Sequence, residues 1–216
     1  MHDFVFKAIE SVAAIFSLWC VYLAAKNNIL NWPISMIASV LYFGVFFQNR
    51  FYSDAYLQIV FLLFQIFGWY VWSKQKKAQK MDSASLINHK KTTQAATQTN
   101  PIRSLSLCET FRYFLIFLFF WGCYYVIYLY LFDNPRAPLL DTFLTSVSLL
   151  ALYLQAKRII NHWYLWIFAD ILYVPLYFWG NQYITSALYA IFIGLAVWGL
   201  KSWQKEKAAQ LNSLPI

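Results

Sequence analysis

The sequence predicts an all-α membrane protein in which seven transmembrane helices form two parallel three-helix repeats joined by a connecting helix. Composition is the first observation: 61% of the 216 residues are hydrophobic and only 12% are charged, about half the charged fraction of a typical soluble domain. The second is a set of seven apolar runs, each close to the ~17–25 residues that a membrane-spanning helix needs. These runs cover approximately residues 4–25, 32–47, 55–72, 111–132, 139–156, 163–179 and 184–203.

The basic residues predict how the chain is oriented. With seven spans, one side of the membrane carries Lys7, Arg50 and Arg136, and the other side carries the remaining 14 of the 17 Lys and Arg residues. Because Lys and Arg concentrate in cytoplasmic connections, we expect the N-terminus outside and the C-terminus inside. This topology accounts for the net charge of +8, so the sequence predicts a lipid bilayer and no nucleic acid as a partner.

An internal repeat divides the chain. Shifting the sequence by 131 positions from Glu10 onward gives 17 identities in 63 ungapped positions, where this apolar composition would give about five by chance. Trp32 matches Trp163, Gly68 matches Gly199, and Trp72 matches Trp203. A single span lies between the two units, so both cross the membrane in the same direction, a plan known from transporters.

The repeat also sets the expected domain boundaries. Residues 74–110 are basic and polar, which is typical of a disordered cytoplasmic tether. The expected units are a first three-helix repeat at 1–73, the tether at 74–110, a connecting transmembrane helix at 111–134, a second three-helix repeat at 135–204 and a cytoplasmic tail at 205–216.

One carboxylate lies deep in an expected span. Asp170 follows His162 by eight residues, which places it ~12 Å into a hydrocarbon core ~30 Å thick. On a helix it shares a face with Trp163, Trp166 and Tyr173. A charge at that depth is costly without a partner, so Asp170 is either a binding residue or a structural acid bonded to a neighbouring helix. Indole faces beside a carboxylate suit a flat, positively charged ring.

Other polar residues within the spans are candidates for the same site. Gln58 and Gln65 lie seven residues apart, hence on one face of the third span. Gln58 matches Tyr189 in the repeat, and Ser148 lies in the fifth span. Buried amides and hydroxyls often only hold helices together, which is the alternative for each. The predicted substrate-binding residues are therefore Trp163, Trp166, Asp170, Tyr173, Gln58, Gln65, Ser148 and Tyr189.

Catalytic motifs are missing from the sequence. It has no GxxxxGK[ST] phosphate loop, no HExxH motif and no nucleophile with a base beside it. We therefore expect no enzymatic activity, no metal site and no cofactor.

Two segments resemble the PnuC family of bacterial vitamin transporters: the stretch from Asn31 to Trp72 and the stretch from Trp163 to Tyr183. The most specific element is a WxxWxxx(N/D) signature, present here as Trp163, Trp166 and Asp170. The resemblance implies a 3+1+3 fold similar to SWEET sugar transporters, in the bacterial inner membrane. It also implies uptake of nicotinamide riboside by facilitated diffusion, a cytoplasmic kinase that traps the product, and a homotrimer.

The last position of the signature is Asp here, where one version of the family pattern has Asn. A negative charge suits a cationic substrate and disfavours neutral ones such as riboflavin. Nicotinamide riboside and thiamine both carry a positive ring, so charge does not separate them. Thiamine, another ring vitamin, or a binding component that needs a separate motor protein remain the alternatives.

Overall fold

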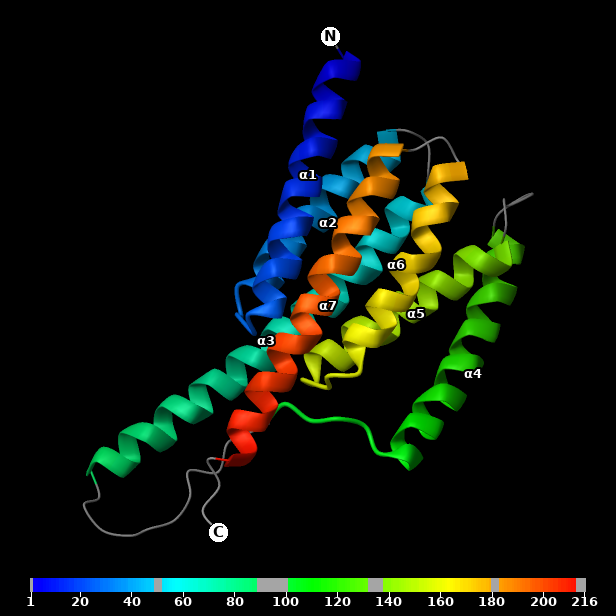
Figure 1. Cartoon of the computed structure of the whole chain (residues 1–216). Coiled ribbons are helices and arrows are strands. Elements are labelled where there is room, and N and C mark those ends of the chain that lie inside the picture. Colours follow the sequence, from blue (N-terminus) through cyan, green and yellow to red (C-terminus); the bar gives the residue numbers. More distant parts are fainter. Residues whose placement is uncertain (1, 49–51, 89–100, 132–137, 180–182, 213–216) are drawn as a thin grey trace.

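The computed structural model describes residues 2–48, 52–88, 101–131, 138–179 and 183–212 (Figure 1). In these ranges the secondary structure is all α-helical, apart from turns and one isolated β-bridge. The seven helices of the described residues are α1 (His2–Ala25), α2 (Asn31–Gln48), α3 (Tyr52–Asn88), α4 (Leu107–Leu131), α5 (Pro138–Ala156), α6 (His162–Trp179) and α7 (Tyr183–Asn212).

Five of these helices are long and apolar enough to cross a membrane, within the described residues. Two of the seven expected spans, α2 and α6, fall outside that set. Each has 18 residues, so a stretch of that length includes all of its polar residues, among them Asn31 and Gln48 in α2 and His162 and Asp170 in α6. The qualifying segments are Ala8–Ala25 in α1, Ala55–Ala78 in α3, Leu107–Leu131 in α4, Leu139–Ala156 in α5 and Thr185–Asn212 in α7.

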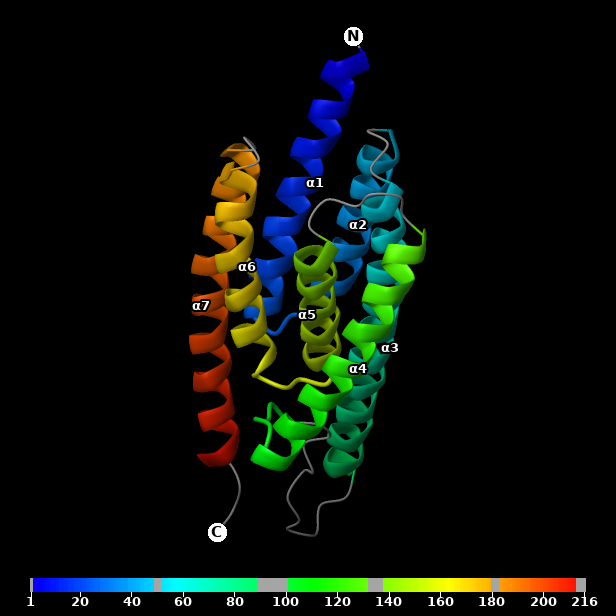
Figure 2. The ribbon, with the colours of Figure 1, turned by 90° about the vertical axis from the view of Figure 1, so that its right-hand side faces the viewer.

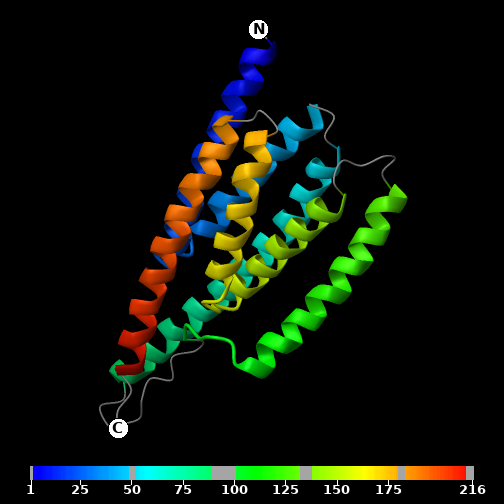
Figure 3. The same cartoon turned by 45° about the vertical axis from the view of Figure 1, so that its right-hand side comes forward.

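Six helices form a closed ring. In order around it, α1 contacts α2, α2 contacts α3, α3 contacts α5, α5 contacts α6, α6 contacts α7, and α7 contacts α1. The helix α4 stands outside the ring and packs on α5 (Figures 2 and 3). Helices α1, α3, α5 and α7 run in one direction and α2, α4 and α6 in the other (Figure 1). The two three-helix units are therefore parallel, and they meet at two seams, α1/α7 and α3/α5.

The turn after the first helix of each unit has the same backbone structure in both repeats. Asn27 and Arg158, which are 131 residues apart, both have a left-handed backbone, with φ of 51° and 55°. Asn28 N donates to Leu23 O, and Ile159 N donates to Leu154 O, each at 2.9 Å. Burial lowers the pKa of the Arg158 guanidinium, and the Glu206 carboxylate opposes this shift.

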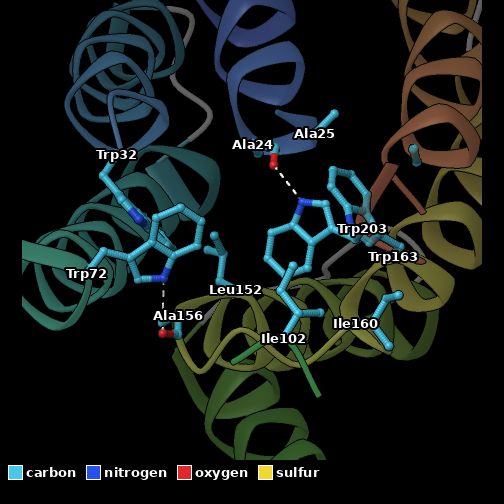
Figure 4. Close-up of a cluster of buried hydrophobic side chains, with 11 residues drawn as sticks. Ala24, Ala25, Trp32, Trp72, Ile102, Leu152, Ala156, Ile160, Trp163 and Trp203 are labelled. Atoms are coloured by element: carbon cyan, nitrogen blue, oxygen red, sulfur yellow. Dashed lines mark hydrogen bonds between the residues drawn. The ribbon is translucent and has the colours of Figure 1, made fainter. Parts of the chain in front are cut away.

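Four buried tryptophans pack at the end of the ring where these turns lie (Figure 4). Each repeat contributes an edge-to-face pair: Trp32 with Trp72 at 5.5 Å, and Trp163 with Trp203 at 6.0 Å between ring centroids. We call Trp32, Trp72, Trp163 and Trp203 the tryptophan quartet. It forms the centre of the largest buried cluster among the described residues.

The same end of each seam carries a matching aromatic stack. Tyr22 of α1 stacks on Trp198 of α7, with centroids 5.5 Å apart and the rings inclined by 14°. Its repeat equivalent, Tyr153 of α5, stacks on Phe67 of α3 at 6.4 Å and 1°. A lysine ammonium lies over each stack: Lys26 is 4.6 Å from the Tyr22 ring, and Lys157 is 5.7 Å from Phe67 and 5.8 Å from Tyr153. Such cation–π contacts stabilise both seams.

The described part of the expected tether is ordered, and the prediction that it is disordered is wrong there. Helix α3 continues past residue 73 to Asn88, because its Lys, Gln and Ala residues form helix readily. Residues 89–100 lie outside the described residues. Residues 101–106, which we call the strap, are ordered against the ring, and Ile102 is only 3% exposed. Helix α4 begins at Leu107, four residues earlier than expected, and α7 extends through most of the predicted tail to Asn212.

Candidate substrate site

Asp170 is the only carboxylate among the buried residues of the described chain, with 5% of its surface exposed. It lies in the middle of α6, one turn before Pro175 interrupts the helical hydrogen bonding. Among the described residues its carboxylate makes no hydrogen bond and no ion pair. A carboxylate in an apolar setting is stabilised by cations and hydrogen-bond donors, so its position favours a ligand that carries positive charge.

Three tyrosine rings form a stack that begins one turn after Asp170. Tyr173 and Tyr189 are 4.7 Å apart between ring centroids, Tyr177 and Tyr189 are 5.1 Å apart at 18°, and Tyr173 and Tyr177 are 5.8 Å apart at 24°. Tyr173 lies one turn after Asp170 on the same face of α6, and Tyr189 of α7 packs on the Tyr173 ring. Together α6 and α7 present an acid next to a wall of stacked aromatic rings, the surface that a planar cation prefers.

Tyr177 was not among the predicted site residues, although it lies on the same face of the helix as Asp170. Its contact with Tyr189 brings it into the site, and this contact spans α6 and α7. The signal was present in the sequence, since residues 170, 173 and 177 follow helical spacing.

Ser148 of α5 joins the site through Tyr173. The Ser148 side chain lies near the Tyr173 hydroxyl, and the Ser148 hydroxyl donates to Leu144 O at 3.0 Å. The first repeat contains the equivalent pair, Tyr42 with Ser17. Because the pair recurs without an acid in the first repeat, it also serves to hold neighbouring helices together.

Gln65 and Ser39 form the polar centre of the first repeat. Gln65 Nε2 donates to Ser39 Oγ at 2.9 Å, which links α3 to α2. Ser39 is the repeat equivalent of Asp170 and is likewise 5% exposed. The Gln65 Oε1 atom is buried without a hydrogen bond to any described residue, and it is an acceptor that a ligand hydroxyl could use. Gln58 is half-buried, and no described contact joins it to Asp170 or the tyrosines.

The two signature tryptophans occupy different environments. Trp163 is 2% exposed and belongs to the tryptophan quartet. Its ring lies so close to Gly199 that a Cβ added there would be 2.6 Å from it. Seven residues along the helix separate Trp163 from Asp170, a rise of ~10 Å, so Trp163 packs in the core rather than beside the acid. Trp166 is half-buried, packs against the same cluster, and lies one turn from Asp170.

Comparison with known proteins identifies the family. The family of nicotinamide mononucleotide transporters matches residues 7–205, nearly the whole chain. The chain belongs to this family. It is therefore a multi-pass membrane transporter and not an enzyme. Within the described residues, no group of three or more His, Cys, Asp or Glu side chains is arranged to hold a metal ion.

Two curated relatives of this transporter differ in their substrates. The nicotinamide riboside transporter PnuC of Escherichia coli is 25% identical over 223 residues, covering 90% of this chain and 84% of the relative. The riboflavin/roseoflavin transporter RibM of Streptomyces davaonensis is 23% identical over 196 residues, covering 90% and 83%. The crystal structure of the vitamin B3 transporter PnuC matches with a TM-score of 0.72 and 20% identity, covering 93% of this chain and 82% of that one. The fold is therefore that of PnuC.

Proposed function

We propose that this transporter takes up nicotinamide riboside across the bacterial inner membrane by facilitated diffusion, with the N-terminus outside and the C-terminus in the cytoplasm. The observation that carries the proposal is Asp170, a buried carboxylate without a hydrogen-bonding partner among the described residues, one turn from Tyr173 in a stack of three tyrosine rings. Nicotinamide riboside carries a positive pyridinium ring and a ribose with hydroxyl groups, so it complements both features.

The site residues divide between the two ends of such a substrate. Asp170 neutralises the pyridinium charge, while Tyr173, Tyr177 and Tyr189 provide aromatic faces for the ring, with Trp166 one turn away. Gln65 and Ser39 of the opposite repeat supply a hydrogen-bond acceptor and a hydroxyl for the ribose. The nicotinamide riboside transporter of Escherichia coli, 25% identical, supports this choice of substrate.

Transport proceeds by alternating access. The two units meet mainly at the α1/α7 and α3/α5 seams, so small rotations of one unit against the other open the binding site to either side. No energy source acts on the chain itself. A cytoplasmic kinase makes uptake effectively irreversible by phosphorylating the product, and the transporter assembles as a homotrimer.

There are three alternatives, and the first two concern another ring vitamin as the substrate. Thiamine also carries a cationic ring and fits the charge of Asp170 equally well. Riboflavin, the substrate named for the Streptomyces relative, has a larger neutral ring that gains nothing from a carboxylate. A third alternative is a binding component that depends on a separate motor protein.

Reconstitution in liposomes tests the proposal. Radiolabelled nicotinamide riboside should equilibrate across the vesicle membrane without ATP or an ion gradient, and unlabelled nicotinamide riboside should compete better than thiamine or riboflavin. Stronger competition by thiamine would reassign the substrate. If purified protein binds but does not transport, it is a component of a larger system. If collapsing a proton gradient abolishes uptake, transport is coupled to protons instead of occurring by facilitated diffusion. Asp170 would then be a proton-coupling residue.

A further inference from the structure

The strap forms a fixed wall at the end of the ring that we place in the cytoplasm. Ile102 N donates to Gln210 Oε1 at 3.0 Å, and Leu105 N donates to Asn161 Oδ1 at 2.9 Å. Between them, Arg103 exchanges backbone hydrogen bonds with the turn that precedes α6: Arg103 N donates to Arg158 O, and Ile160 N donates to Arg103 O. The strap thus ties the start of α6 to the last turns of α7.

A pocket of about 420 Å³ lies between the strap, the start of α6 and α7. This volume is within the range of small-ligand sites, ~300–1,000 Å³. The side chains that could bind a ligand are polar but not acidic: Ser104, Asn161, Tyr164, Gln204 and Lys207.

Lys207 makes the pocket positive. Its ammonium donates to Ser104 Oγ at 2.7 Å, and two further N–H groups remain for a ligand. Two neighbouring acids are already engaged. Glu206, next to Lys207 in sequence, accepts from Asn27 Nδ2 at 2.7 Å, and Glu109, five residues after Ser104, forms a salt bridge with Arg103 at 2.8 Å. An ammonium surrounded by neutral donors, without a carboxylate in the lining, favours an anion with several oxygen acceptors.

The position of the pocket further restricts which class of anion it can bind. It lies at the first turn of α6, where this helix leaves the level of the lipid headgroups, and Tyr164 and Leu211 on its rim are 51% and 60% exposed. Tyrosine and lysine are typical of the membrane interface, and anionic lipids collect at the cytoplasmic leaflet. We propose that this pocket binds the phosphate group of an anionic ligand, either the headgroup of an anionic lipid or a soluble phosphate ester.

Two variants and one control test the site. Lys207→Gln removes the positive charge, and Asn161→Asp adds a negative one while keeping the oxygen that accepts from Leu105 N. Lys205→Gln is the matched control, because Lys205 is an exposed lysine on the same helix outside the pocket lining. Each is purified alongside the parent, and circular dichroism shows that its helices are intact.

The experiment separates the two ligand sources. In the lipid arm, native mass spectrometry counts phosphatidylglycerol molecules retained from mixed phosphatidylglycerol/phosphatidylcholine nanodiscs. In the soluble arm, the lipid-free protein in neutral detergent is titrated with glycerol 3-phosphate and followed by its thermal unfolding midpoint. We expect the site variants to lower retention or affinity by about fivefold in at least one arm and the control to leave both unchanged. Equal behaviour of the parent, both site variants and the control in both arms would overturn the proposal.

Discussion

Trp72 and Trp203 form reciprocal hydrogen bonds between the repeats. Trp72 Nε1 of the first unit donates to Ala156 O at the end of α5, at 3.2 Å, and Trp203 Nε1 of the second unit donates to Ala24 O at the end of α1, at 2.9 Å (Figure 4). Each bond crosses one seam and reaches a carbonyl in the last turn of a helix; the Ala24 carbonyl also accepts from Asn27 N at 2.9 Å. The two repeats are therefore held together at one end of the ring by equivalent contacts.

Removing either indole N–H should weaken that end of the protein. Trp72→Phe removes the bond to the Ala156 carbonyl, which should cost about 1–3 kcal/mol of unfolding free energy. Trp203→Phe should cost less, because Ala24 O still accepts from Asn27 N. Circular dichroism in detergent should show a lower midpoint of thermal unfolding for both variants. Trp69→Phe on the same helix as Trp72 is the control, because Trp69 is 47% exposed. If all three variants unfold at the same temperature as the parent, the seam bonds contribute nothing to stability.

Gly199→Ala should destabilise the fold through one specific contact. The added methyl would lie 2.6 Å from the Trp163 ring, and overpacking of this kind costs about 1–3 kcal/mol. Thermal unfolding of Gly199→Ala, Trp163→Phe and the double variant measures the contact, because the shorter Phe ring removes the atoms that clash.

Gly194→Ala provides the control for this series. It lies on the same helix, and a Cβ there meets nothing within 4 Å, so this variant should be neutral or slightly stabilised by the higher helix propensity of alanine. A double variant no more stable than the sum of the two single changes would contradict the contact.

Asp170 should control the binding of cationic rings. Asp170→Asn keeps the shape of the side chain and removes its charge, so the affinity for nicotinamide riboside should fall at least about tenfold, the ratio that ~1.4 kcal/mol represents. We expect Asp170→Ala to abolish binding and Trp166→Ala to weaken it severely, with near-normal folding. Calorimetric titration with nicotinamide riboside and thiamine side by side measures each affinity.

The control for the charge is Glu109→Gln. Glu109 forms a salt bridge with Arg103 of the strap at 2.8 Å, and no described contact joins it to Asp170 or the tyrosines, so its loss should leave substrate affinity unchanged. Binding of nicotinamide riboside to Asp170→Ala with the affinity of the parent would show that the cation site lies elsewhere.

The strap should contribute measurably to stability. Ile102 is 3% exposed within the cluster that contains the tryptophan quartet, so Ile102→Ala should cost about 2–4 kcal/mol. Leu107→Ala, at the residue that directly follows the strap and is 89% exposed, should cost almost nothing. Denaturant or thermal unfolding in detergent compares the two variants, and equal stability would mean that the strap does not pack on the ring in solution.

The repeat was the part of the fold most accessible from sequence. Identical residues at a fixed offset imply the same structure twice, and the matching turns at Asn27 and Arg158 have nearly the same φ. The α3 extension was also within reach, since Lys, Gln and Ala favour helix, but their polarity is equally typical of a tether. The strap was not, because its order depends on hydrogen bonds to Asn161 and Gln210, far away in the sequence.

The candidate site was only partly accessible for a related reason. Helical spacing places Trp163 on the same face as Asp170, but one face of a helix can meet different neighbours along its length. Trp163 meets Gly199 and Trp203 in the core, whereas Asp170 lies one turn from the tyrosine stack of α6 and α7. The spacing of residues tells which face of a helix a side chain occupies. Packing against other helices decides what that side chain contacts at its position along the helix.

Ser39 and Asp170 occupy equivalent positions in the two repeats, and only one of them can carry charge. In the proposed site, a substrate with a charged end and a hydroxylated end would therefore meet different groups in the two repeats. A transporter with the same residue at both positions would accept such a molecule either way round. The exchange of one side chain would thus give the substrate a preferred orientation.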